Sequence, residues 1–140
     1  MLFIVIRKEF FENMSYINYN ANPKGLKTGD CVIRALSKAT GKSWDEVYTE
    51  LCGIGYKKKK LPNNDCVYKA FLKENHFYLH PAIRDEYGKL VSVDYFSKIK
   101  NSGIYIVHTR NHLTIVSDGD IYDTWNTSRQ TAGKYYSEDL

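Results

Sequence analysis

Residues 104–125 read IYIVHTRNHLTIVSDGDIYDTW, and their pattern decides the predicted fold of the C-terminal part of the chain. β-Branched and aromatic residues dominate three short runs, which predict strands at 104–109, 112–117 and 120–125. Asp118-Gly119 separates the second run from the third, and this dipeptide is typical of the two-residue turn of a β-hairpin. We therefore expect an antiparallel sheet, to which Tyr135-Tyr136 adds an edge strand.

Helical patterns precede this sheet. Apolar residues at helical spacing predict four helices, which begin at or just after Cys31, Ser43, Asn64 and Ser92. The first is expected to end at Gly41, and the second starts with the capping-box sequence SWDE and is expected to end at Gly53 and Gly55. Helices followed by strands are typical of the α+β class. We expect N-terminal helices packed on a C-terminal antiparallel β-sheet.

The chain has 140 residues, a length typical of one domain, which we expect over residues 15–140. Residues 15–29 are rich in Asn, Gly and Lys and predict a loop. Residues 1–14 leave two alternatives open. They are either an N-terminal extension that begins upstream of Met14, or an edge strand made by residues 2–6.

The composition excludes several classes of protein. Hydrophobic residues make up 43% and charged residues 26%, which argues against a disordered or fibrous chain. No apolar run approaches the ~20 residues of a membrane span, and the start lacks a signal-peptide pattern. The net charge is only +4, and the lysines cluster only at residues 57–60, where a solvated loop explains them. We expect a cytoplasmic protein that binds no membrane. Binding of nucleic acid or another acidic partner through residues 57–60 is the weaker alternative.

The three cysteines, Cys31, Cys52 and Cys66, form no C-x-x-C pair, so free thiols are expected. Cys31 lies in the first turn of a predicted helix, where backbone N–H groups and the helix dipole favour a thiolate. Its own N–H is also a candidate oxyanion donor. A buried structural thiol is the alternative for Cys31, and Cys66 has a similar helix position. Cys52 is expected in the core.

His112 begins the second predicted strand, and the hairpin brings an acidic residue close to it. If Asp118-Gly119 is the turn, His112 pairs with Trp125, and Asp123 is its diagonal neighbour on the same face. An aspartate there can bind one imidazole nitrogen and direct the other towards a thiol. Asn126 is the rival orienting residue, but this register points it to the opposite face. A shift of the strand register by one residue would move Asp123 off the face that carries His112.

The other histidines have simpler interpretations. His76 and His80 are four residues apart, a spacing that can hold a metal on a helix, but no Glu occupies the metalloprotease position between them. We interpret both as surface or loop residues and expect neither a metal nor another cofactor. His108 shares its strand face with Ile104 and Ile106 and is expected to pack in the core.

The order Cys31, His112, Asp123 resembles that of the papain-like cysteine peptidase superfamily, in particular the NlpC-type cell-wall peptidases and the bacteriocin leader peptidases. Two segments, GDCVIRALSKATGKSWDEVYTEL at 29–51 and HLTIVSDGDIYDTWNTS at 112–128, are also similar to small uncharacterised proteins of phages and prophages of low-GC Gram-positive bacteria. This similarity covers most of residues 15–136. It implies a papain-like fold with the nucleophile on an N-terminal helix.

The resemblance implies a Cys-His-Asp triad in which Cys31 is the nucleophile, His112 the general base and acid, and Asp123 the orienting group. Trp125 and Asn126 are expected supporting residues. Papain-like peptidases usually place a Gln before the cysteine to complete the oxyanion hole, whereas no Gln precedes the cysteine here. Asn22 is the expected substitute donor, with Asn20 as the alternative.

These observations together predict a phage-type cysteine hydrolase, or thiol protease, that cleaves a peptide, isopeptide or amide bond through an acyl-enzyme. Its partner would be a protein or peptide substrate, and it would act in the cytoplasm, the host cytoplasm if a phage encodes it. The alternative is a non-catalytic phage protein that uses the same fold to bind and inhibit a host protein.

Overall fold

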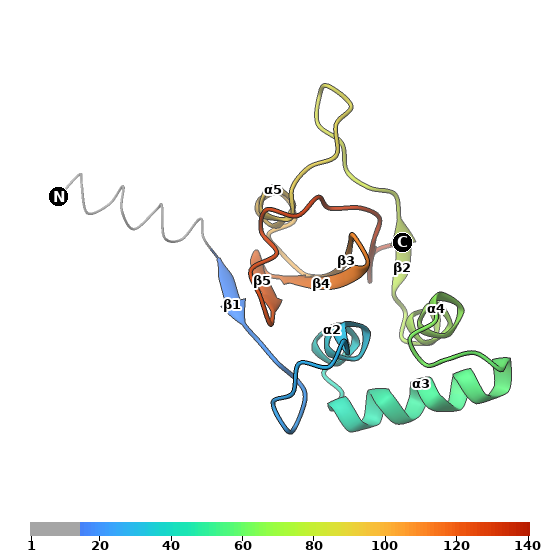
Figure 1. The fold of residues 1–140 in the computed structure, drawn as a ribbon. Coiled ribbons are helices and arrows are strands. Elements are labelled where there is room, and N and C mark those ends of the chain that lie inside the picture. The colour runs from blue at the N-terminus through green and yellow to red at the C-terminus, as the bar shows by residue number, and fades with distance from the viewer. Residues whose placement is uncertain (1–14) are drawn as a thin grey trace.

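Six strands form one mixed sheet in the computed structural model, which describes residues 15–140 (Figure 1). The strands are β1 (Tyr16–Asn18), β2 (Tyr78–His80), β3 (Ile104–Thr109), β4 (His112–Ser117), β5 (Asp120–Asp123) and β6 (Tyr135–Ser137). Their order across the sheet is β1-β5-β4-β3-β6-β2. The fold is therefore α+β, as predicted. The two alternatives for residues 1–14 lie outside the described residues.

The sheet differs from the prediction in three of its short strands, β1, β2 and β6, and in the end of β5. Residues 15–29 contain the short strand β1, which runs parallel to β5, so the sheet is mixed rather than antiparallel. Residues 78–80 form the edge strand β2, which has no clear alternating pattern and was not predicted. β6 lies between β3 and β2 and is an interior strand rather than an edge. The errors in β1, β2 and β6 concern strands of three residues, which carry little periodicity to detect.

The described helices are α2 (Cys31–Thr40), α3 (Trp44–Lys58), α4 (Asp65–Glu74) and α5 (Val93–Ile99). Local signals set the starts of three of them. The Ser43 side chain accepts a hydrogen bond from the Glu46 N–H in a complete capping box, and the Asn64 and Ser92 side chains each accept one backbone N–H at the start of α4 and α5. Gly41 ends α2 in the left-handed conformation, as predicted. The predicted end of α3 is wrong, because the helix continues through both glycines to Lys58.

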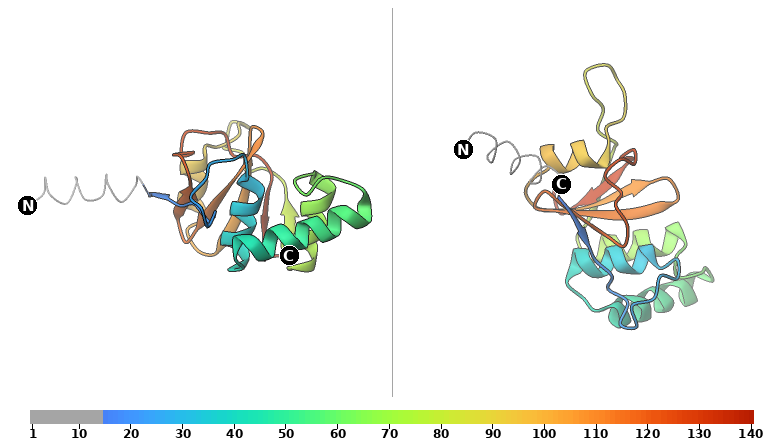
Figure 2. Two further views of the ribbon diagram at one scale, coloured as in Figure 1. Left: turned by 60° about the horizontal axis from the view of Figure 1, so that its bottom comes forward. Right: turned by 60° about the vertical axis from the view of Figure 1, so that its left-hand side comes forward.

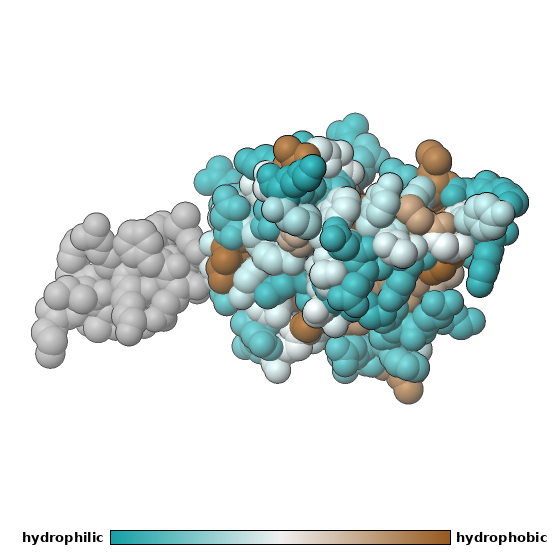
Figure 3. All heavy atoms as spheres, turned by 90° about the horizontal axis from the view of Figure 1, so that it is seen from below, coloured by the Kyte–Doolittle hydropathy of each residue, from teal (hydrophilic) through white to brown (hydrophobic). Residues whose placement is uncertain are grey.

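Helices cover both faces of the sheet (Figures 1 and 2). On one face α2, α3 and α4 bury a core that includes Leu36, Phe71 and Ile115. On the other face α5 packs through Phe96 against the opposite side chains of β3 and β6. Seen from the side of α3, the surface is mostly hydrophilic, with isolated apolar side chains (Figure 3). None of the helices in the described part of the chain combines the length and apolar character of a membrane span.

The β4–β5 hairpin has the predicted turn and register, but β5 ends at Asp123 rather than at residue 125, so the predicted pair of His112 with Trp125 is not formed. Asp118 and Gly119 both have positive φ, +48° and +84°, as a type I′ turn requires. Ser117 pairs with Asp120, and the pairing continues to Ile115 with Tyr122. This register brings the start of β4 beside the end of β5, where His112 and Asp123 lie.

Candidate active site

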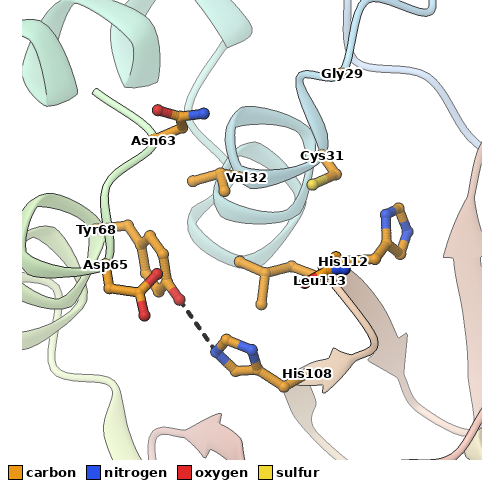
Figure 4. A pocket seen from close by; sticks show the side chains of 10 residues that line it. Gly29, Cys31, Val32, Asn63, Asp65, Tyr68, His108, His112 and Leu113 are labelled. Atoms are coloured by element: carbon orange, nitrogen blue, oxygen red, sulfur yellow. Dashed lines mark hydrogen bonds between the residues drawn. The ribbon is translucent and has the colours of Figure 1, made fainter. Parts of the chain in front are cut away.

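Cys31 is the first residue of α2, and its thiol is half-buried at the edge of a cavity. The N–H groups of the first helical turn have no intrahelical acceptors, so they present positive dipoles beside the sulfur. The cavity, whose lining side chains Figure 4 shows, has a volume of about 400 Å³. Its lining residues are Gly29, Cys31, Val32, Asn63, Asp65, Tyr68, His108, Asn111, His112 and Leu113.

His112 and Asp123 are directly hydrogen-bonded, with 2.6 Å between Nε2 and Oδ2. Asp123 is 4% exposed, and its Oδ1 accepts a hydrogen bond from the Thr124 N–H. The Asp123 carbonyl oxygen accepts bonds from the Tyr19 N–H and the Tyr16 hydroxyl, so β1 holds the end of β5 in place. Because Nε2 is bound to the carboxylate, Nδ1 is the imidazole nitrogen left to interact with a thiol.

The pKa values of Cys31 and His112 shift in opposite directions. Burial alone would raise the pKa of the Cys31 thiol, but hydrogen bonds from His112 and the Leu113 backbone, with the charges of His112 and Arg34, outweigh burial and lower it. Burial alone would lower the pKa of His112, but the interactions with Asp123 and Cys31 raise it to about 9. Both shifts favour a thiolate paired with an imidazolium.

Trp125 lies beside this pair. Its ring centroid is 5.3 Å from that of His112, and the residue is 43% exposed, so the indole covers part of the imidazole from solvent. Asn126 is exposed, and its side-chain oxygen accepts a hydrogen bond from the Ser128 N–H. Asp123, rather than Asn126, is therefore the residue that contacts His112.

Asn22, the expected oxyanion donor, lies on the loop between β1 and α2. Its amide nitrogen donates to Asp30 Oδ2 at 3.3 Å, and its oxygen accepts from the Lys24 N–H. The alternative donor, Asn20, gives its amide hydrogen to the Leu26 carbonyl. The role of Asn22 stays a prediction, and the donor that the helix itself supplies is the N–H of Cys31.

A buried ionic network that the sequence analysis missed lies directly behind Cys31. Arg34 forms an ion pair with Asp30 and lies 3.8 Å from Asp123 Oδ1. Asp30 also accepts hydrogen bonds from the Trp44 indole at 2.8 Å and from Asn22. The sequence did contain a signal for this ion pair: Asp30 and Arg34 are four residues apart at the start of a largely apolar helix.

His108 lines the same cavity and lies between His112 and Tyr68 (Figure 4). Its Nε2 is 3.2 Å from the Tyr68 hydroxyl, and burial lowers its pKa. The prediction that His108 packs in the core is therefore only partly right. His108 lies near the end of β3, where it lines the cavity beside α2 and α4. Asp65 adds a carboxylate beside Tyr68.

The other two cysteines lack this environment. Cys52 is half-buried on α3, less enclosed than predicted, and Cys66 is exposed near the start of α4. None of the three cysteines forms a disulfide. His80 lies on β2, where its Nε2 contacts Ser137 Oγ and the Asp139 carbonyl. Cys31 is thus the thiol that lies next to a histidine with a carboxylate partner.

Comparison of the chain with protein-family models, with curated proteins and with solved structures found no match.

Proposed function

We propose that this protein is a thiol hydrolase of papain-like arrangement, which cleaves a peptide, isopeptide or amide bond through an acyl-enzyme on Cys31. One observation carries the proposal: Cys31 and a carboxylate-bound His112 border the same cavity. The nucleophile on a helix N-terminus, followed by His and Asp on strands, is the order seen in papain-like peptidases. The substrate is a protein or peptide, and the site of action is the cytoplasm.

The proposed reaction has two steps. The Cys31 thiolate attacks the carbonyl carbon, the C–N bond breaks, and His112 gives its proton to the leaving amine. His112 then removes a proton from water, which attacks the thioester, releases the carboxylic acid and restores the thiol. The Cys31 N–H stabilises the oxyanion in both steps, and Asp123 keeps the imidazole oriented throughout.

The proposal predicts selective reactivity of Cys31. Iodoacetamide should alkylate Cys31 near neutral pH or below, because its lowered pKa increases the thiolate fraction there, while Cys52 and Cys66 serve as internal controls. His112→Ala should remove this selectivity, and mass spectrometry resolves the three thiols. Equal reactivity of all three cysteines in the unmodified protein would rule out the proposed site.

A second experiment tests catalysis itself. Incubation with a peptide library should give products that are absent with Cys31→Ala, whose circular dichroism should match the unmodified protein because the substitution changes one half-buried side chain. Cys66→Ala is the matched control and should retain turnover. Turnover that persists in Cys31→Ala would contradict the proposal.

The second candidate is a non-catalytic phage protein that binds a host protein. The engagement of Asn22 with Asp30 favours it, since the amide of Asn22 is then held by a carboxylate rather than free to donate to an oxyanion. Selective alkylation of Cys31 without any cleavage of the peptide library would support this candidate. A pull-down with the Cys31→Ala variant then identifies the bound protein.

A further inference from the structure

Arg34 connects the helix that carries Cys31 to the strand that carries Asp123. It lies one turn after Cys31 on α2 and is 7% exposed, so its charge is almost removed from water. Its guanidinium contacts Asp30 on one side and lies 3.8 Å from Asp123 Oδ1 on the other. The fork of an arginine can contact two carboxylates at once, which an ammonium group does less well.

Asp30, Arg34 and Asp123 form a buried ionic cluster. Asp30 is 7% exposed and receives the Trp44 indole and the Asn22 amide in addition to Arg34. A second cavity of about 10 Å³, large enough for about one water, is bordered by Cys31, Arg34 and Asp123 together. Cys31, Arg34 and Asp123 therefore border one common space.

The charges of this cluster show why Arg34 matters to the site. Two buried carboxylates and one guanidinium leave one net negative charge beside His112 and Cys31. Without Arg34, the buried Asp30 carboxylate would lose its cationic partner and only His112 would balance Asp123, and buried like charges oppose ionisation of a thiol. The guanidinium also lies at ion-pair distance, 3.8 Å, from the carboxylate that is bonded to His112.

We propose that Arg34 is a positioning residue of the thiol site, which holds Asp123 towards His112 and maintains the positive charge beside Cys31. This inference rests on the proposed function, because it assigns Arg34 a role in preparing that nucleophile. Arg34 acts through Asp123 and through its charge, and it bonds to no reacting atom.

The test is the pH dependence of Cys31 alkylation by iodoacetamide in a set of variants. Arg34→Gln should slow alkylation at pH 6 about tenfold, because each unit rise in the thiol pKa reduces the thiolate fraction tenfold. Arg34→Lys keeps the charge and should recover most of this loss. Lys38→Met is the matched control. It removes another cation of α2, which lies over the Tyr122 ring of β5, and it should leave the pH dependence of Cys31 alkylation unchanged.

Asp30→Asn gives a prediction of opposite sign and keeps the acceptor for Trp44. It removes a buried negative charge next to Cys31, so the midpoint of alkylation should move to lower pH. If Arg34→Gln does not fold, as judged by circular dichroism, this variant decides: an unchanged or raised midpoint overturns the proposal. A folded Arg34→Gln with the original profile also overturns it.

These outcomes separate the two proposals. If Cys31 of the unmodified protein shows no selective reactivity, the proposed function fails. If Cys31 is selectively reactive but Arg34→Gln and Lys38→Met behave alike, only the role of Arg34 fails.

Discussion

The imidazole of His112 is the titratable group whose charge bears most directly on both stability and chemistry. Its hydrogen bond to Asp123 and its interaction with Cys31 raise its pKa to about 9, against the opposing effect of burial. A group whose pKa is higher in the folded than in the unfolded state stabilises the folded state at every pH at which the folded protein keeps it protonated. Stability should therefore depend on pH through this residue.

The first stability prediction concerns His112→Ala. The contribution of the charged imidazole is complete below about pH 6.5, the usual pKa of an unfolded histidine, and is lost as the pH rises through about 9. The variant should therefore lose about 2–3 kcal/mol more unfolding free energy at pH 6 than at pH 10. Urea unfolding at the two pH values measures this difference.

The matched control for that measurement is His76→Asn. His76 is exposed with φ of +63°, a backbone conformation that asparagine tolerates. Its effect on stability should be small at both pH values. A loss in His112→Ala that does not change with pH would show that the imidazole contributes only packing.

Helix α3 shows how a close backbone contact determines where a helix ends. The loop after α3 folds back so that the Lys60 N–H donates to the Gly55 carbonyl, at 2.9 Å. A Cβ atom at Gly55 would lie 2.5 Å from the Lys60 carbonyl oxygen, whereas a Cβ atom at Gly53 would meet no atom within 4 Å. Gly55 thus permits the contact, while Gly53 is a replaceable helical glycine.

The two glycines give a paired prediction. Gly55→Ala should destabilise the protein by about 1–3 kcal/mol, because the backbone of residues 60 and 61 must move. Gly53→Ala, two residues away on the same helix, should stabilise it by about 0.5–1 kcal/mol through helix propensity. Thermal unfolding compares both with the unmodified chain, and changes of equal sign would contradict the assignment.

At the scale of the whole molecule, residues 15–140 form two apolar cores separated by the sheet. The core of α2, α3 and α4 positions Cys31, whereas the core under α5 contains Phe96 and the inner side chains of β3 and β6. Phe96 is fully buried, with its ring edge-on to Tyr105 and Tyr135. A substitution in the core under α5 can therefore lower the stability of the protein from the face of the sheet opposite Cys31.

Phe96→Ala should cost roughly 3–5 kcal/mol of unfolding free energy, because it leaves a cavity in the second core. The midpoint of Cys31 alkylation should nevertheless stay unchanged in the folded variant, since α5 lies across the sheet from α2. Ile99→Ala, at an exposed position of the same helix, should change neither quantity. A shifted alkylation midpoint in Phe96→Ala would show that the two cores are coupled.

The features that the sequence by itself determined depend on residues close together in the chain. The Asp118-Gly119 turn follows from the backbone angles that this dipeptide favours, and the turn then fixes the register that joins His112 to Asp123. The starts of α3 and α4 follow from the side chains of Ser43 and Asn64, which cap the next few N–H groups. These are local interactions, so a single sequence is sufficient to predict them.

Only the tertiary structure decided the features that join distant segments. The parallel pairing of β1 with β5 and the interior place of β6 depend on which strands meet, and strands of three residues carry no pattern that specifies a partner. The same holds for Arg34, whose side chain could face solvent or protein until Asp30 and Asp123 were placed around it. Periodicity identifies elements, whereas burial of a charge depends on how those elements pack.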